Sequence, residues 1–431
     1  MIAPSRTLAS WPLSNRPTIA PIVVGAICGA FISSLTVLNF ALRRPWEAAA
    51  LYAAHEDTPV LLSVLATLAL VGAAAMSFVA SWRLGADYRR QKLSFLFFYA
   101  LSLSATISGL AADAANMPIL LGTMFLAFAM ELNIGALDDW RPLLSAFCVA
   151  ATLVFAFADL LALTSHDYTW GRLGGHAGPN YWGINSAAML ILCLFLKPAW
   201  LRVPIVAIAL VTLYFAQARG SMLGAAVGLS LMAGLKLARM PARRSVFWAV
   251  VGVCGLAVIL ILFGDLLAKK ILLLNDANRG AGSKGSGRLL IWQEVLSVVG
   301  DHPLIGVGLH QVQQYLRAAS VAHNAYLSTL GEQGLVGLTI YLVMMVGGLV
   351  RISIKALRDP TAPYLPLAGF IGFFLGLGLL EAYSLQTGNA YSVIVLICIA
   401  IAWRVEIPAP SHAPLPIQAW GRTAPAQGSG S

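Results

Sequence analysis

The sequence predicts an all-α integral membrane protein with about twelve transmembrane helices. Hydrophobic residues make up 59% of its 431 residues and charged residues only 11%, which is more apolar than a water-soluble core of this length requires. Apolar runs long enough to cross a hydrocarbon layer of roughly 30 Å recur along the chain. Backbone groups in lipid must be hydrogen-bonded within their segment, and the runs lack the alternating polarity of barrel strands, so they predict helices.

The predicted spans are separated by short polar or proline-containing breaks. They lie near residues 19–41, 59–82, 93–111, 117–136, 142–164, 181–197, 199–217, 220–238, 245–265, 333–350, 363–383 and 388–403. The chain therefore divides into a leader (1–18), nine spans (19–265), one long hydrophilic loop (266–332), three further spans (333–404) and a tail (405–431). The tail is rich in Pro, Ala and Ser, which predicts disorder.

The distribution of positive charge predicts the orientation of the chain in a bacterial inner membrane. Most of the 28 Lys and Arg residues fall in alternate connections and near both termini, and such positive segments stay in the cytoplasm. Both termini are therefore expected to be cytoplasmic, with the loop 266–332 on the periplasmic face. The formal net charge of +10 reflects this topology and an attraction to anionic lipid or substrate. No nucleic-acid motif is present, so no nucleic-acid partner is expected.

The long outer loop contains the strongest candidate for a catalytic base. Residues 288–299 have the apolar spacing of an amphipathic helix, and a bend at Pro303, Gly306 and Gly308 follows. His323 then stands where the loop re-enters the bundle. A histidine beside a substrate hydroxyl can act as a general base, although a lone histidine is more often structural. His302 and His310 adjoin turn residues and are weaker candidates.

Two arginines are candidates for binding an anionic substrate. Arg219 lies between two hydrophobic runs, and Arg288 starts the predicted amphipathic helix. A guanidinium near lipid needs a carboxylate, a lipid phosphate or an anionic substrate, and snorkelling to lipid headgroups is the alternative. Two guanidiniums together could hold a pyrophosphate through bidentate hydrogen bonds.

Further candidates for substrate contact lie in a second outer loop and at the outer end of a late span. Arg172 and His176 stand among glycines and aromatic residues in the segment 168–182; aromatic rings stack on sugars but also mark membrane interfaces. Glu381 could reach a basic site residue or an acceptor sugar. For the intramembrane acids Glu131 and Asp159, a structural pairing is the favoured interpretation.

The chain carries no motif for a nucleotide or a metal. It has no Walker loop, no DxD-type pair in the outer loop and no HExxH, and its five cysteines lack metal-ligand spacing. The sequence therefore predicts no metal and no cofactor, which fits a donor that is an activated lipid.

These residues carry a resemblance to the O-antigen ligase superfamily. The stretch SGRLLIWQEVLSVVGDHPLIGVG, followed by AHNAYLSTLGEQGLVG, resembles the family's Arg-x-x-x-Trp helix, His-Pro-Leu-x-Gly-x-Gly turn and His-Asn-x-Tyr-Leu re-entry. The ARGS segment at Arg219 and the GRLGGHAGPN segment also resemble family segments. Asn324 and Tyr326 belong to the re-entry motif and are added as candidates for substrate contact.

The resemblance implies a metal-independent membrane glycosyltransferase whose catalytic loop is the outer loop 266–332. His323 would deprotonate the acceptor hydroxyl, and Arg219 and Arg288 would hold the pyrophosphate of an undecaprenyl pyrophosphate-linked glycan. Displacement would invert the anomeric carbon. A developing pyrophosphate charge gains from cations aimed at it in a poorly hydrated site, in agreement with this assignment.

The acceptor separates two related functions. A ligase would transfer the glycan to lipid A-core, whereas a Wzy-type polymerase would transfer it to a second lipid-linked glycan. We expect a ligase, with the polymerase as the alternative because the stretch between Arg288 and His323 is shorter than in lipopolysaccharide ligases. A lipid or solute transporter, the alternative of another class, would predict a repeat relating two halves of the chain, and none is apparent in the sequence.

Overall fold

The computed structural model describes residues 19–41, 60–112, 117–165, 168–169, 171–174, 178–266, 288–317, 322–382 and 390–406. The predicted leader, most of the predicted tail and the Gly- and Ser-rich segment before Arg288 lie outside these ranges.

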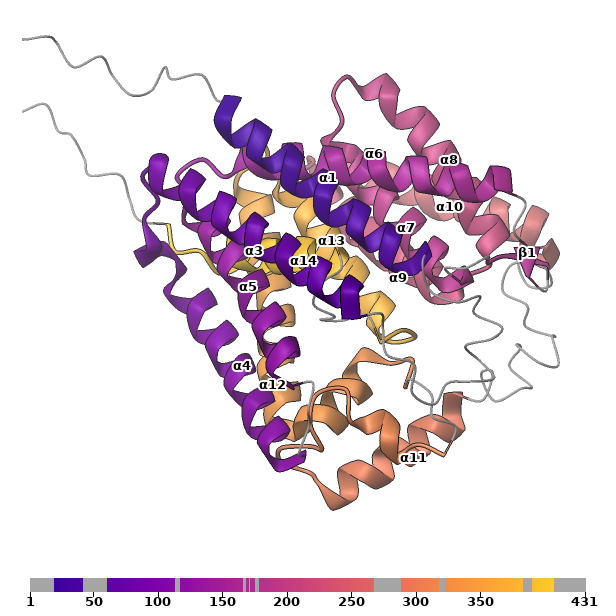
Figure 1. Cartoon of the computed structure of the whole chain (residues 1–431). Helices are drawn as coiled ribbons and strands as arrows, with labels where there is room; N and C mark the ends of the chain where they lie inside the picture. Colours follow the sequence, from indigo (N-terminus) through magenta and orange to yellow (C-terminus); the bar gives the residue numbers. More distant parts are fainter. Residues whose placement is uncertain are drawn as a thin grey trace, which may run out of the picture.

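The described chain is almost entirely helical (Figure 1). The first half contains α1 (Ile19–Ala41), α3 (Val60–Arg83), η2 (Tyr88–Gln91), α4 (Lys92–Ala112), α5 (Met117–Ala136), α6 (Arg141–Ser165), the two-residue strands β1 (Tyr168–Thr169) and β2 (Arg172–Leu173), and α7 (Pro179–Leu192). The second half contains η3 (Cys193–Phe195), η4 (Ala199–Leu201), α8 (Arg202–Ala216), α9 (Arg219–Ala238), α10 (Ala242–Leu266), α11 (Arg288–Asp301), η7 (Val312–Tyr315), α12 (Ala325–Arg358), α13 (Tyr364–Gly378) and α14 (Ala390–Trp403). The two strands pair antiparallel and form a small hairpin before α7.

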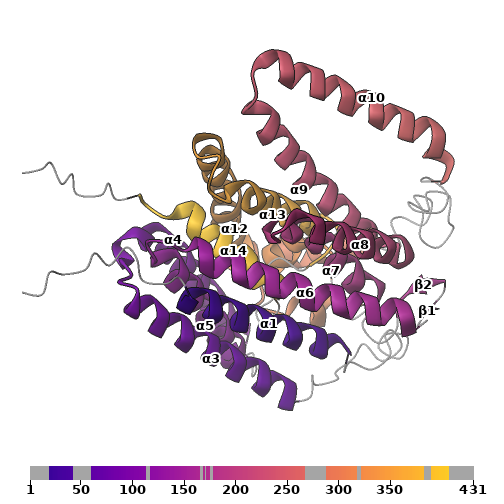
Figure 2. The same cartoon turned by 90° about the horizontal axis from the view of Figure 1, so that it is seen from above.

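The chain is a multi-pass membrane protein. Within the described ranges, six helical segments are long and apolar enough to cross a membrane, at α1, α4, α6, α8, α9 and α12. Shorter apolar helices occur at α3, α5, α13 and α14. A helix lies at each of the twelve predicted spans, and the crossing of the bilayer by all twelve stays a prediction. In Figure 2, α9 and α10 form a V that projects from the bundle, and α10 exposes apolar side chains such as Val253 and Ile261.

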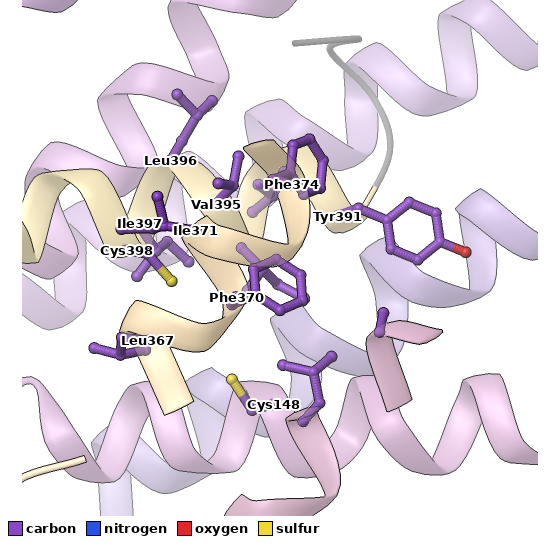
Figure 3. Close-up of a cluster of buried hydrophobic side chains, with 14 of the residues drawn as sticks. Cys148, Leu367, Phe370, Ile371, Phe374, Tyr391, Val395, Leu396, Ile397 and Cys398 are labelled. Carbon is purple, nitrogen blue, oxygen red and sulfur yellow. The ribbon is translucent and has the colours of Figure 1, made fainter. Parts of the chain in front are cut away.

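The two last helices, α13 and α14, form the centre of the bundle. Every residue of α14 from Ala390 to Ala402 is buried, and α13 buries Phe370, Phe373 and Phe374. Figure 3 shows rings of α13 lying beside side chains of α14, with Cys148 of α6 close by. A helix that is apolar on all sides can be buried on all sides, which explains why α14 carries no polar stripe.

Glycines allow α9 to pack directly against α13. The spacing Gly220, Gly224, Gly228 puts a hydrogen in place of a side chain on every fourth residue of one face of α9. A Cβ at Gly228 would lie 2.5 Å from the Gly369 carbonyl oxygen, and one at Gly224 would lie 2.9 Å from that of Phe373. The two backbones are therefore in contact, and this seam fixes the start of α9 against the end of α13.

The long helix α12 is broken at Gly334, and the preceding loop pairs with the break. Gly334 has φ 65° and ψ −167°, a conformation open in practice only to glycine. The N–H groups of Val307 and Gly308 donate to the carbonyls of Gly331 and Glu332 at 2.9 Å each.

The same loop also accepts hydrogen bonds from the far side of the break. Leu335 and Val336 donate to the carbonyls of Pro303 and Leu304 at 2.8 and 3.2 Å. A helix break inside a membrane protein leaves backbone groups that cost several kcal/mol each when unpaired. The segment HPLIGVG therefore acts as a plug that completes the hydrogen bonding of α12.

Gly334→Ala should destabilise the protein. Its positive φ is strained for alanine by about 1–3 kcal/mol, and its Cβ would overlap the backbone of Leu304. We expect a lower Tm of the detergent-solubilised protein, measured by tryptophan fluorescence on heating. Gly234→Ala is the matched control, because a Cβ at that helical glycine of α9 meets no atom within 4 Å. Equal Tm values for the two variants would contradict the role of the plug.

Candidate active site

A buried carboxylate connects two of the predicted site residues. The side chain of Glu381 is only 4% exposed, and it lies just beyond the end of α13. Its Oε1 accepts a hydrogen bond from Arg288 Nη2 at 3.1 Å, and its Oε2 lies 3.3 Å from His323 Nδ1. One carboxylate thus joins a cation from α11 to the histidine that precedes α12.

Helix α11 positions Arg288 and the segment before His323 together. Arg288 is the first residue of α11, and Trp292 follows one turn later on the same face. Trp292 Nε1 donates to the carbonyl of Ala322 at 2.8 Å. The spacing Arg-x-x-x-Trp therefore has a structural reason, because the arginine reaches Glu381 while the indole holds the residue next to His323.

The segment from α11 to the start of α12 has a small apolar core of its own. Val295 and Val298 of α11 pack with Val307, Val312, Leu316 and Ala322, separately from the core of the bundle. Glu294 also accepts a hydrogen bond from the backbone N–H of Arg317 at 3.0 Å. Arg288 and His323 are consequently carried on a folded unit that is attached to α12 through the plug.

His323 is held in an unusual backbone conformation. Its φ is +46°, a left-handed value that is uncommon for residues other than glycine. The next residue, Asn324, caps α12 by accepting hydrogen bonds from the N–H groups of Tyr326 and Leu327 at 3.0 and 2.9 Å. Strained conformations of this kind concentrate at functional sites.

The residues that follow His323 fasten α12 to the end of α13. Asn324 Nδ2 donates to the Leu379 carbonyl at 3.1 Å, and the Tyr326 hydroxyl donates to the Leu375 carbonyl at 2.7 Å. Both polar side chains, which the sequence offers as candidates for substrate contact, therefore make contacts within the protein. These contacts keep His323 beside Glu381.

Arg219 enters the same region from the start of α9. Gly220 lies against Glu381, since a Cβ there would be 3.1 Å from Glu381 Cγ. Arg219 precedes it and is partly exposed. The glycine seam between α9 and α13 therefore places the backbone of Arg219 next to the carboxylate that Arg288 and His323 share.

Arg172 fixes the turn that leads into Arg219. Its Nε donates to the Ala216 carbonyl at 2.8 Å, and its Nη2 donates to the Gln217 carbonyl at 3.2 Å. These carbonyls belong to the end of α8, where intrahelical donors are lacking. His176, predicted alongside Arg172, lies outside the described residues.

The intramembrane acids Asp159 and Glu131 have different surroundings. Asp159 is fully buried and accepts hydrogen bonds from Asn185 Nδ2 at 2.9 Å and from the Ser186 hydroxyl at 2.7 Å. Glu131 is also fully buried, and in the described part of the chain neither of its oxygens has a hydrogen-bond partner. Both of these donors to Asp159 come from α7, so this acid ties α6 to α7.

The arrangement is suited to chemistry on an anion. Arg288 and the N-terminus of α11, which carries a partial positive charge, lie at one buried carboxylate, and the residue after Arg219 packs against the same side chain. If the Nδ1 of His323 carries its proton toward Glu381, its Nε2 is left with a lone pair that can accept a proton. A base and cations thus occur within one region at the end of the bundle.

Comparison with known proteins finds similarity to one family. Residues 204–342 match the family described as O-antigen ligase, and this stretch contains Arg219, Arg288 and His323. The chain is also 26% identical over 341 residues to the exopolysaccharide production protein ExoQ of Rhizobium meliloti (strain 1021). The aligned stretch covers 69% of this chain and 76% of that protein. Both similarities support an assignment of the chain to the O-antigen ligase superfamily.

The similarity to this family bears on the activity at a coarse level. It supports a membrane glycosyltransferase of the polysaccharide ligase or polymerase type, acting on a lipid-linked polysaccharide substrate. Glu381 lies beyond the matched residues, and its central position emerges only from the fold. The signal in the sequence was an acid near the end of a span, which needs partners when it is buried.

Asn324→Ala should reduce stability as well as transfer, because it removes the cap of α12 and the bond to Leu379. Loss of such a cap costs about 1 kcal/mol. Asn324→Ser is the matched control, since a serine hydroxyl can cap a helix, and it should recover much of the lost Tm. If Asn324→Ala abolished transfer at an unchanged Tm, Asn324 would contact the substrate instead.

Proposed function

We propose that this protein transfers a glycan from undecaprenyl pyrophosphate to an acceptor hydroxyl at the periplasmic face of the bacterial inner membrane. The observation that carries the proposal is that Glu381 contacts both Arg288 and His323, while Gly220, the residue after Arg219, packs against Glu381. A general base can take the proton of the acceptor hydroxyl, and guanidiniums can stabilise the charge that develops on the leaving pyrophosphate. Both termini are proposed to face the cytoplasm.

In the proposed reaction, the acceptor oxygen attacks the anomeric carbon of the donor sugar. His323 Nε2 takes the hydroxyl proton as the new carbon–oxygen bond forms. The bond from the anomeric carbon to the phosphate oxygen breaks, and undecaprenyl pyrophosphate leaves from the opposite side, so the configuration is inverted. His323 later releases the proton to water.

The arginines and Glu381 have separate roles in this proposal. Arg288 donates one N–H to Glu381. A guanidinium has five N–H donors, so others can donate to the pyrophosphate oxygens. Arg219 would supply the second guanidinium. Glu381 is a positioning residue, because it orients the imidazole of His323 and holds Arg288.

We propose lipid A-core as the acceptor, which makes the protein a ligase. The alternative acceptor, a second lipid-linked glycan, would make it a Wzy-type polymerase. This alternative is favoured by the name of the relative ExoQ, which refers to exopolysaccharide production. Both reactions use the same donor chemistry and the same three residues.

His323→Ala should lower the rate of glycan transfer by about 100-fold or more, the size expected for loss of a general base, while donor binding is retained. Arg219→Ala and Arg288→Ala should weaken donor binding as well. Binding is measured with a labelled lipid-linked donor on the detergent-purified protein. His302→Ala is the matched control from the same outer segment and should keep wild-type transfer. Wild-type turnover by a folded His323→Ala protein would remove the proposed base.

The acceptor is decided by offering purified protein an undecaprenyl pyrophosphate-linked glycan with EDTA present, with and without lipid A-core. Glycan attached to lipid A-core would establish a metal-independent ligase. Chains that lengthen with donor alone would establish a polymerase. No transfer in either reaction, with an intact donor and a folded protein, would contradict the proposal and favour a transporter.

A further inference from the structure

A second charged site lies at the other end of α12. A cavity of about 450 Å³ is lined there by the last two turns of α12, the start of α6, the start of α13 and the residues after α14. The helix runs on from its break at Gly334 to Lys355, which at 1.5 Å per residue is a rise of roughly 30 Å. The cavity is therefore about one hydrocarbon thickness away from the break at Gly334, and it lies at the start of α13, whereas the residues after His323 contact the end of α13.

Positive charge exceeds negative charge in this cavity. Its five cationic lining residues are Arg141, Arg351, Lys355, Arg358 and Arg404. Its three carboxylates are Asp138, Asp359 and Glu406. The lining has a surplus of two positive charges, before any partner outside the cavity is considered.

Each carboxylate of the lining lies within ion-pair distance of a cation, and for Asp138 that cation lies outside the cavity. Asp138 pairs with Arg90 at 2.5 Å, and Glu406 lies 3.6 Å from Lys355. Asp359 lies 4.0 Å from Arg141. In the described part of the chain, no carboxylate lies within ion-pair distance of the other three arginines of the lining.

Two of these arginines are held in place by neutral groups. Arg351 Nε donates to the Ala402 carbonyl at 3.3 Å, and its guanidinium lies 5.0 Å from the centre of the Trp403 ring. Arg404 Nη1 donates to the Leu137 carbonyl at 2.6 Å. Burial and the neighbouring Arg90 lower the pKa of Arg404 from its ordinary value. The positive charge is therefore concentrated and held in place. A surface arginine, in contrast, could rotate its guanidinium toward the solvent.

Arg141 lies in an electrostatically unfavourable position, which a bound anion would stabilise. It is the first residue of α6, where the helix dipole disfavours a cation. Its side chain is half exposed and its only described ion pair is the long one to Asp359. An anion in the cavity would face Arg141 and the partial positive charge of the α6 N-terminus together.

We propose that this cavity binds a phosphate group, supplied either by the headgroup of an anionic phospholipid or by a soluble phosphate. Planar guanidiniums bind phosphate oxygens through paired hydrogen bonds, and basic pockets between membrane helices accept anionic headgroups. The bound phosphate would hold the ends of α6, α12 and α14 together. The proposal is independent of the chemistry at His323.

The test uses the full chain purified in neutral detergent. Dioleoylphosphatidylglycerol, dioleoylphosphatidylcholine and sodium phosphate are added separately at constant ionic strength. Binding is followed by the rise in Tm and, for the lipids, by native mass spectrometry. The pocket variant is Arg141→Gln with Arg358→Gln, which leaves the arginines that hold backbone carbonyls intact. The control is Arg243→Gln with Arg244→Gln, which removes two exposed charges from the start of α10, at the same end of the bundle.

We expect dioleoylphosphatidylglycerol or phosphate to bind the wild type, and the pocket variant to lose affinity by at least tenfold while the control keeps it. Binding of the lipid alone identifies a headgroup site, whereas equal binding of phosphate with displacement of the lipid identifies a soluble phosphate. Equal losses in the two variants, equal binding of dioleoylphosphatidylcholine, or no binding to the wild type would overturn the proposal. If the pocket variant does not fold, Arg358→Gln alone replaces it, because that side chain is exposed.

Discussion

The candidate site depends on the burial of one carboxylate. A charged Glu381 with 4% of its side chain exposed would be costly without partners, because burial removes the water that stabilises its charge. Arg288 and His323 provide those partners from two segments that are distant in sequence. The requirement to satisfy this carboxylate therefore brings a cation and a candidate base to one point.

Two features of the backbone make that convergence possible. The glycine seam lets α9 approach α13 closely enough for Gly220 to contact Glu381. The break of α12 at Gly334 accepts the segment 303–308, so the unit that carries α11 is fixed to the membrane bundle by backbone hydrogen bonds. The strained positions at His323 and Gly334 are stabilised by these surroundings, which is how strain persists near functional sites.

The sequence contained much of the fold but only part of the site. The apolar runs locate the helices, and the spacing from Arg288 to Trp292 places both side chains on one helical face. The roles of Asn324 and Arg172 were harder to predict, because each side chain satisfies backbone groups that become neighbours only after folding. The pattern of Pro and Gly predicted a turn at Pro303. The hydrogen bonds between this turn and α12 could not be predicted, because they form only in the tertiary structure. The place of Glu381 near the end of a span set it apart from Asp159 and Glu131, but the sequence did not show that it would contact both Arg288 and His323.

The most direct test of the account is a double-mutant cycle on Glu381 and Arg288, measured as the rate of glycan transfer from a lipid-linked donor. Glu381→Gln, Arg288→Gln and the double variant are compared with the wild type at equal amounts of folded protein. If the two side chains act as one unit, the double variant should lose little more activity than the more damaged single variant. Losses that multiply in the double variant would mean that the two residues act independently, and would contradict a site organised by Glu381.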